Sequence, residues 1–102
     1  MKILLVCSGG MSSAIVAKAL QDAGQKAGLD ITVTECGTQA FASEVANGYD
    51  AALVAPQIRH RYDVLSESAK AAGIPVALIQ PTGYTPLGGP KLLTQVKELL
   101  GL

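Results

Sequence analysis

The sequence predicts an α/β fold of one domain, residues 1–102, in which a four-stranded parallel sheet of strand order 2-1-3-4 is doubly wound, with helices on both faces. Three observations favour this class. Short apolar runs alternate with helical patterns along the chain. The connections between them are short, which implies right-handed crossovers between parallel strands. Apolar residues make up 49% of the chain and aromatic residues only 4%, as expected where small aliphatic side chains pack helices onto a sheet.

The first half of the chain is predicted to hold two strands and two helices. They cover residues 3–6, 13–27, 31–34 and 38–46. The first strand is wholly apolar, which is typical of a central parallel strand, whereas the alternation in the second indicates an edge strand. The first helix is expected to bury one face, formed by Ile15, Val16, Ala19, Leu20 and Ala23. Thr38 is the expected N-cap of the second helix, and Asn47 with Gly48 predicts a turn after it.

The second half is predicted to repeat the alternation. Two further strands and two helices are expected at residues 51–55, 58–72, 75–79 and 91–100. Pro56 stops the third strand and Gly73 ends the helix that follows, while residues 80–90 form a loop rich in glycine and proline. The side chains expected to face the core from the two helices are Ile58, Tyr62, Leu65, Ala69, Leu92, Val96 and Leu99.

Charge and hydropathy exclude several classes of partner. Eight Lys and Arg residues balance eight Asp and Glu residues, so neither nucleic acid nor an anionic membrane surface is indicated. The apolar runs are far shorter than the roughly 20 residues of a membrane span, and the apolar N-terminal segment is too short for an export signal. We therefore expect a cytoplasmic protein without membrane insertion, whose two cysteines, Cys7 and Cys36, are reduced. The only histidine, His60, has no neighbours with metal-ligand spacing, so no metal site is expected.

The segment Cys-Ser-Gly-Gly-Met-Ser-Ser-Ala, residues 7–14, carries the strongest functional signal. Cys7 ends the first strand, and in doubly wound sheets ligands bind beyond the carboxyl ends of the strands, beside the first strand. Gly9 and Gly10 let backbone N–H groups turn around an anion, and the following helix points its N-terminus at the loop. Hydroxyl donors come from Ser8, Ser12 and Ser13. The segment predicts a phosphate-binding cup with a partly ionised thiol at its floor.

Three other interpretations of this cup remain open. Cys7 can be an unreactive buried residue, because cysteine often packs as a small apolar side chain. The cup can also bind the phosphate of a ligand in a module without enzymatic activity. Finally, the fold and loop are flavodoxin-like and resemble the low-molecular-weight protein tyrosine phosphatases, so a phosphatase-like, arsenate-reductase-like or thiol redox enzyme is an alternative.

The phosphatase motif is incomplete. That family carries C-x5-R, but Ser13 stands at the arginine position, and no arginine precedes Arg59. Those enzymes also use an aspartate on a late loop as general acid, whereas residues 80–90 contain no acid. Without the guanidinium group and the acid, a phosphate on the Cys7 sulfur should be hydrolysed slowly. This favours a phosphoryl carrier over a phosphatase.

The stretch CSGGMSSAIVAKAL, together with residues 55–58 (APQI) after the third strand, resembles the IIB component of the bacterial phosphoenolpyruvate-dependent sugar phosphotransferase system, of the lactose/cellobiose and chitobiose type. The resemblance covers essentially the whole chain. One departure is Ala14, where relatives often carry a hydroxyl residue.

The resemblance implies a phosphorelay without a metal or diffusible cofactor. The cysteine of the family receives a phosphoryl group from a phosphohistidine of the IIA protein. It passes the group to a sugar, expected to be a β-linked disaccharide, bound by the IIC membrane transporter. Carried over to this sequence, Cys7 is the nucleophile. The shell that binds the phosphoryl oxygens consists of Ser8, Gly9, Gly10, Met11, Ser12, Ser13 and Ala14.

Residues from the later loops are candidates for the rim of the cup or for contacts with a partner. They are Gln57, Arg59, Arg61 and Tyr84. Arg59, His60 and Arg61 open the helix after the third strand, where they form either a docking patch or an ordinary solvated first turn. Tyr84 can equally be an exposed aromatic residue of the loop. Cys36 is expected to be passive, with a disulfide to Cys7 as the redox alternative.

Overall fold

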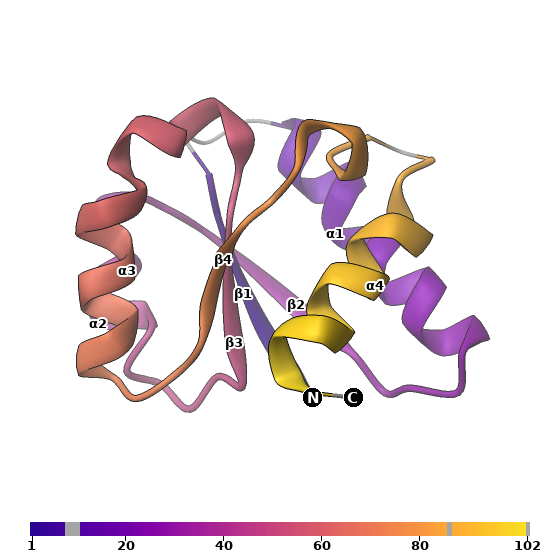
Figure 1. Ribbon diagram of the computed structural model, residues 1–102, viewed down its shortest axis with the longest axis horizontal. Coiled ribbons are helices and arrows are strands. Elements are labelled where there is room, and N and C mark those ends of the chain that lie inside the picture. Colours follow the sequence, from indigo (N-terminus) through magenta and orange to yellow (C-terminus); the bar gives the residue numbers. More distant parts are fainter. Residues whose placement is uncertain (8–10, 86, 102) are drawn as a thin grey trace.

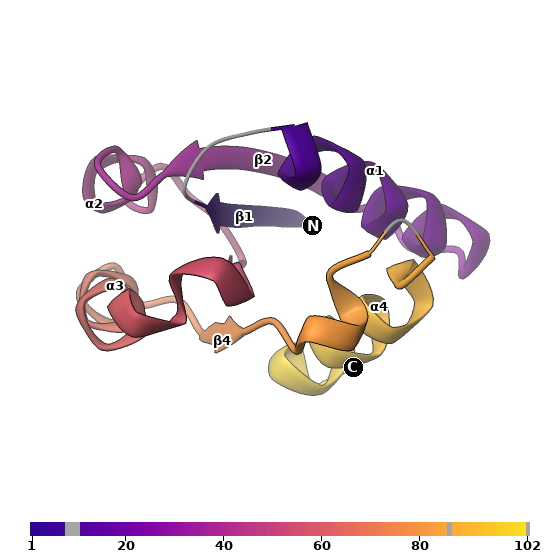
Figure 2. The same ribbon diagram turned by 90° about the horizontal axis from the view of Figure 1, so that it is seen from above.

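The computed structural model describes residues 1–7, 11–85 and 87–101. Its four parallel strands have the order β2-β1-β3-β4, which confirms the predicted fold class and strand order. Helices α1 and α4 cover one face of the sheet, and α2 and α3 cover the other (Figures 1 and 2). The elements are β1 (Lys2–Cys7), α1 (Met11–Lys26), β2 (Thr32–Gly37), α2 (Phe41–Glu44), β3 (Ala51–Val54), the 3-10 helix η1 (Pro56–Arg61), α3 (Tyr62–Ala71), β4 (Val76–Leu78), the 3-10 helix η2 (Pro81–Gly83) and α4 (Gly89–Leu100).

The core lies on both faces of the two central strands. Successive side chains of a strand point to opposite faces, so the apolar run of β1 supplies both halves of the core. Ile3 and Leu5 pack beneath α1 and α4, whereas Leu4 and Val6 pack beneath α2 and α3. All four residues of β3 are fully buried. This is why the first and third strands are continuous apolar runs in the sequence.

The buried face of α1 differs from the predicted one. Val16, Ala17 and Leu20 are buried, but Ile15 is 49% exposed, so the prediction that Ile15 faces the core was wrong. Helix α4 packs closely against α1 farther along the helix. Gly89, the first residue of α4, lies so close to α1 that a Cβ there would come within 2.5 Å of the Ala19 carbonyl oxygen.

Two helices begin later in the chain than predicted. Thr38 is not an N-cap, because β2 continues to Gly37 and a turn then leads into α2, whose N-cap is Ala40. The turn at Gly48 is confirmed by its positive φ of +87°. After β3 the chain forms η1 before α3, with Ile58 in a non-helical conformation, so the helix expected from residue 58 begins only at Tyr62. Ile58 is buried in the core at this break.

Side chains from the helices bond to the two edge strands. On β4, Tyr62 donates to the Val76 carbonyl oxygen at 3.2 Å, and Gln95 donates to the Leu78 carbonyl oxygen at 2.6 Å. On β2, the Oε1 atom of Gln21 accepts a bond of 2.7 Å from the backbone N–H of Val33. These bonds satisfy backbone groups that have no neighbouring strand.

None of the helices in the described part of the chain is long and apolar enough to cross a membrane.

Candidate functional site

Cys7 is the last residue of β1, at the carboxyl end of the sheet. Only 6% of the residue is exposed, and its sulfur lies 3.9 Å from the carbonyl oxygen of Cys36 on β2. The carboxyl end of β1 lies at the same end of the molecule as η1 and η2, which follow β3 and β4, at the top of Figure 1. The predicted position of the cysteine at this end is therefore confirmed.

The segment after Cys7 leads into α1 earlier than expected. Ser8, Gly9 and Gly10 lie outside the described residues. Helix α1 begins at Met11 rather than at Ser13, so Met11, Ser12 and Ser13 form its first turn, followed by the exposed Ala14. The first four N–H groups of an α-helix have no partner within the helix, and they carry its positive partial charge. The chain thus places a helix N-terminus four residues after the thiol.

Cys36 lies beside Cys7, on the neighbouring strand. Both cysteines are free thiols. Burial, the Glu44 carboxylate and the Cys7 sulfur raise the pKa of Cys36 from its ordinary value of 9.0 to about 11. Glu44 is itself held by the hydroxyl group of the buried Tyr49, which donates to its Oε1 atom at 2.6 Å. At neutral pH the neighbour of Cys7 is therefore an uncharged thiol.

The raised pKa of Cys36 predicts a loss of stability in alkaline solution. The unfolded chain releases the Cys36 proton near 9.0 and the folded chain only near 11, so the folded state binds more protons in this window. The free energy of unfolding should then fall as the pH rises through it. In urea titrations across this pH window, the free energy of unfolding should fall more steeply for the native sequence than for Cys36→Ala. Both proteins contain Tyr49, so the comparison isolates Cys36. Equal slopes would contradict the assignment.

Three of the four predicted rim residues meet in one surface pocket. The pocket, of about 260 Å³, lies between η1 and η2 and is lined by Pro56, Gln57, Arg59, Pro81 and Tyr84. Tyr84 is half-buried and packs against both halves of the core, so it is not simply an exposed aromatic residue of the loop. Arg61 does not line this pocket. Arg61 and His60 are exposed and lie in η1, not in the first turn of α3.

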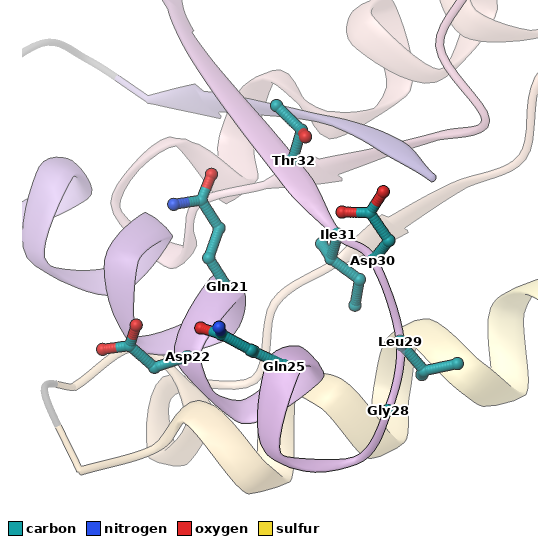
Figure 3. A pocket seen from close by; sticks show the side chains of 8 residues that line it. All are labelled: Gln21, Asp22, Gln25, Gly28, Leu29, Asp30, Ile31 and Thr32. Atoms are coloured by element: carbon teal, nitrogen blue, oxygen red, sulfur yellow. The ribbon is translucent and has the colours of Figure 1, made fainter.

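A larger pocket, of about 560 Å³, lies elsewhere and was not predicted from the sequence (Figure 3). It is formed by the end of α1 and the start of β2, at the end of the sheet opposite to Cys7, and it contains Gln21, Asp22 and Asp30. Gln21 is already bonded to the β2 backbone. The residues that line the pocket include neither a cysteine nor a histidine.

Among the residues that the structure describes, no group of three or more His, Cys, Asp or Glu side chains could hold a metal ion. The described residues bring together, at the carboxyl end of the sheet, a nearly buried thiol, a helix N-terminus and rim residues of the two later loops.

Comparisons with known proteins agree with this arrangement. The model of the family described as "PTS system, Lactose/Cellobiose specific IIB subunit" matches residues 2–95. The oligo-beta-mannoside-specific EIIB component of Bacillus subtilis is 30% identical over 99 residues, which cover 97% of this chain and 95% of the relative. The galactose-specific EIIB component of Lactococcus lactis subsp. cremoris is 26% identical over 102 residues, covering 96% and 94%.

Solved structures give the same result. The lactose-specific IIB domain of Streptococcus pneumoniae superposes with a TM-score of 0.83 at 25% identity, covering 97% of this chain and 96% of that one. The cellobiose-specific IIB component of Borrelia burgdorferi gives a TM-score of 0.75 at 30% identity, covering 99% and 92%. Both the sequence and the fold are thus matched over nearly the full length. The chain belongs to the lactose/cellobiose-specific IIB family of the sugar phosphotransferase system.

Proposed function

We propose that this protein carries a phosphoryl group on Cys7, accepting it from a phosphohistidine of a IIA protein and passing it to a sugar bound by a IIC membrane transporter. Members of its family are phosphotransferase components, which supports a transfer role. The observation that carries the assignment to Cys7 is its position at the end of β1, four residues before the N-terminus of α1. The protein acts on the cytoplasmic side, where it meets both partners.

Each transfer is an in-line displacement at phosphorus. The Cys7 sulfur attacks the phosphorus atom, an S–P bond forms and the P–N bond to the donor histidine breaks. In the second step a sugar hydroxyl attacks, and the Cys7 thiolate leaves. The N–H groups of residues 8–14 would hold the phosphoryl oxygens, and the α1 N-terminus would stabilise their negative charge. Uptake of a β-linked disaccharide is the expected overall reaction.

The chain also explains why the phosphorylated state would persist. Ser13 stands where the related phosphatases have an arginine, so the charge of a hydrolytic transition state receives less stabilisation. Cys36, the thiol next to Cys7, is uncharged at neutral pH because its pKa is about 11, so it is a poor base for activating water. Slow hydrolysis is what a carrier requires.

Intact-mass measurement tests the proposal. The protein is incubated with phosphoenolpyruvate, the general phosphocarrier proteins and a lactose- or cellobiose-type IIA protein. The native sequence should gain the mass of one phosphoryl group, and the adduct should map to Cys7. The group should leave when membranes containing the matching transporter and its sugar are added. Turnover of an aryl phosphate without a stable adduct would instead support the phosphatase alternative.

Arg59 and Arg61 are proposed to steer the partner to the site. Both are exposed in η1, beside the rim pocket that contains Gln57 and Tyr84. Opposite charges on two surfaces accelerate their encounter by about 10-fold or more at low salt. The double variant Arg59→Glu with Arg61→Glu should slow phosphoryl transfer from the IIA protein by at least about tenfold at low salt, with a smaller effect at high salt.

A matched double variant provides the control. Lys26 and Lys70 are exposed in the last turns of α1 and α3, at the end of the sheet away from Cys7. Lys26→Glu with Lys70→Glu makes the same change in net charge. Quench-flow measurements of the rate of phosphoryl transfer to both variants separate local steering from a general effect of net charge. Equal rates for the two variants would contradict the docking role of Arg59 and Arg61.

A further inference from the structure

The two cysteines of the chain form a diagonal pair across neighbouring strands. In the β1–β2 ladder Val6 pairs with Cys36 and Cys7 pairs with Gly37, so the two cysteines are offset by one residue. Strands lie about 4.8 Å apart and rise about 3.3 Å per residue, which places the two Cα atoms about 6 Å apart. Disulfides usually join Cα atoms that are about 4.4–6.8 Å apart. The backbone spacing therefore suits a bridge.

The side chain of Cys7 belongs to the same core cluster as that of Cys36. In a regular strand Cys7 would share a face with Ile3 and Leu5, beneath α1 and α4. It packs instead with Leu4 and Val6 on the opposite face, in the same cluster as Cys36. Its sulfur lies over the Cys36 backbone, 3.9 Å from the carbonyl oxygen. Both side chains thus occupy one region at the end of the sheet.

We propose that Cys7 and Cys36 form a reversible disulfide when the protein meets hydrogen peroxide or a related hydroperoxide, and that this bond switches the site off while protecting Cys7 from irreversible oxidation. The blocking of phosphoryl transfer rests on the proposed function, but the formation of the disulfide does not.

The reaction takes place in two balanced steps. The Cys7 thiolate attacks one peroxide oxygen, the O–O bond breaks, and the departing hydroxide takes up a proton, leaving a sulfenic acid on Cys7. The Cys36 sulfur then attacks the Cys7 sulfur, the S–O bond breaks, and the hydroxide leaves as water with the Cys36 proton. Two thiols and one hydrogen peroxide give one disulfide and two waters.

The surroundings assign different roles to the two thiols. Burial and Glu44 raise the pKa of Cys36 to about 11, so it remains protonated at neutral pH and reacts poorly with peroxide by itself. Cys7 precedes the N-terminus of α1, where negative charge is favoured. Cys36 becomes effective only when a sulfenic acid forms next to it, because proximity raises its effective concentration by orders of magnitude.

The test begins with the reduced native protein and hydrogen peroxide in slight excess, followed by alkylation of the remaining thiols. The expected product takes up no alkyl group, weighs two hydrogens less than the reduced chain, and yields one non-reduced peptide pair that joins Cys7 to Cys36. Dithiothreitol should restore both thiols. In the Cys36→Ser control, a dimedone-type probe should label a sulfenic acid on Cys7, and prolonged exposure should give sulfinic and sulfonic acids that dithiothreitol does not reverse.

Other products overturn the inference. It fails if the native protein accumulates sulfinic acid on Cys7 as fast as Cys36→Ser does, or if it forms only disulfides between chains. The second readout uses the native sequence alone, so it does not depend on the folding of the variant. Phosphoryl acceptance is measured separately on the reduced, oxidised and re-reduced protein. If the disulfide forms but the reduced protein accepts no phosphoryl group, the proposed function is refuted. The inference that Cys7 and Cys36 form a disulfide still holds in that case.

Discussion

The Cys7→Ser variant is expected to gain no phosphoryl group from a charged IIA protein under conditions in which the native sequence is labelled completely. A serine hydroxyl is protonated at neutral pH, and Ser13 stands at the position of the arginine in the related phosphatases. The chain has only one histidine, His60, in the exposed η1 segment. Phosphoryl labelling should therefore be absent and not merely slower. Intact-mass measurement over an extended time course distinguishes the two results.

A matched variant separates loss of the nucleophile from damage to the fold. Cys36→Ser makes the same chemical change one strand away, in a side chain that is half-buried and already uncharged at neutral pH. It should be labelled like the native sequence, with little change in the urea midpoint. Labelling of Cys7→Ser, or an adduct at His60 in the native sequence, would refute the assignment of Cys7.

The largest effect on stability is expected from Phe41→Ala. Phe41 is the first residue of α2 and is fully buried, where it packs with Leu4, Val6 and Val54 of the central strands. Truncation of a buried phenylalanine removes its transfer free energy and leaves a cavity, at a cost of about 3–5 kcal/mol. A domain of this size has a total stability of about 5–15 kcal/mol, so the variant should be near the threshold of unfolding at room temperature. Urea titration measures the change.

Val64→Ala is the control for this prediction. Val64 is an apolar residue on α3, but it is 63% exposed, so its truncation should change the free energy of unfolding by no more than about 0.5 kcal/mol. The two variants compare truncations of apolar side chains on the same face of the sheet. A loss below about 1 kcal/mol for Phe41→Ala would show that α2 contributes little to the core, in conflict with the observed packing.

The strand order and the place of the thiol could be predicted from the sequence, because they depend on strong local patterns. β1 and β3 are continuous apolar runs followed by turn-forming residues, so their positions and the end of the sheet at which Cys7 lies follow directly. The place of the rim pocket could also be predicted, because Gln57 and Tyr84 follow neighbouring strands. Three of the residues that line it, Gln57, Arg59 and Tyr84, could be named, but Pro56, Pro81 and the shape of the pocket could not.

What could not be predicted depends on contacts between segments far apart in the chain. Ile15 has the spacing of a core residue, but it is 49% exposed, because burial depends on which parts of α1 other elements cover and not on helical spacing alone. Glutamines on helices are ordinarily solvated, so the bonds of Gln21 and Gln95 to the edge strands leave no sequence signal. The diagonal position of Cys36 beside Cys7 depends on the register of β2, which extends three residues beyond its predicted end.

The bonds that Gln21, Tyr62 and Gln95 make to the edge strands constrain how this molecule can associate. An additional strand from another polypeptide beside β4 would first have to displace two side chains, because the Val76 and Leu78 carbonyl oxygens are already bonded. On β2 the Val33 amide is bonded in the same way. Such capping opposes strand exchange and fibrous assembly between copies.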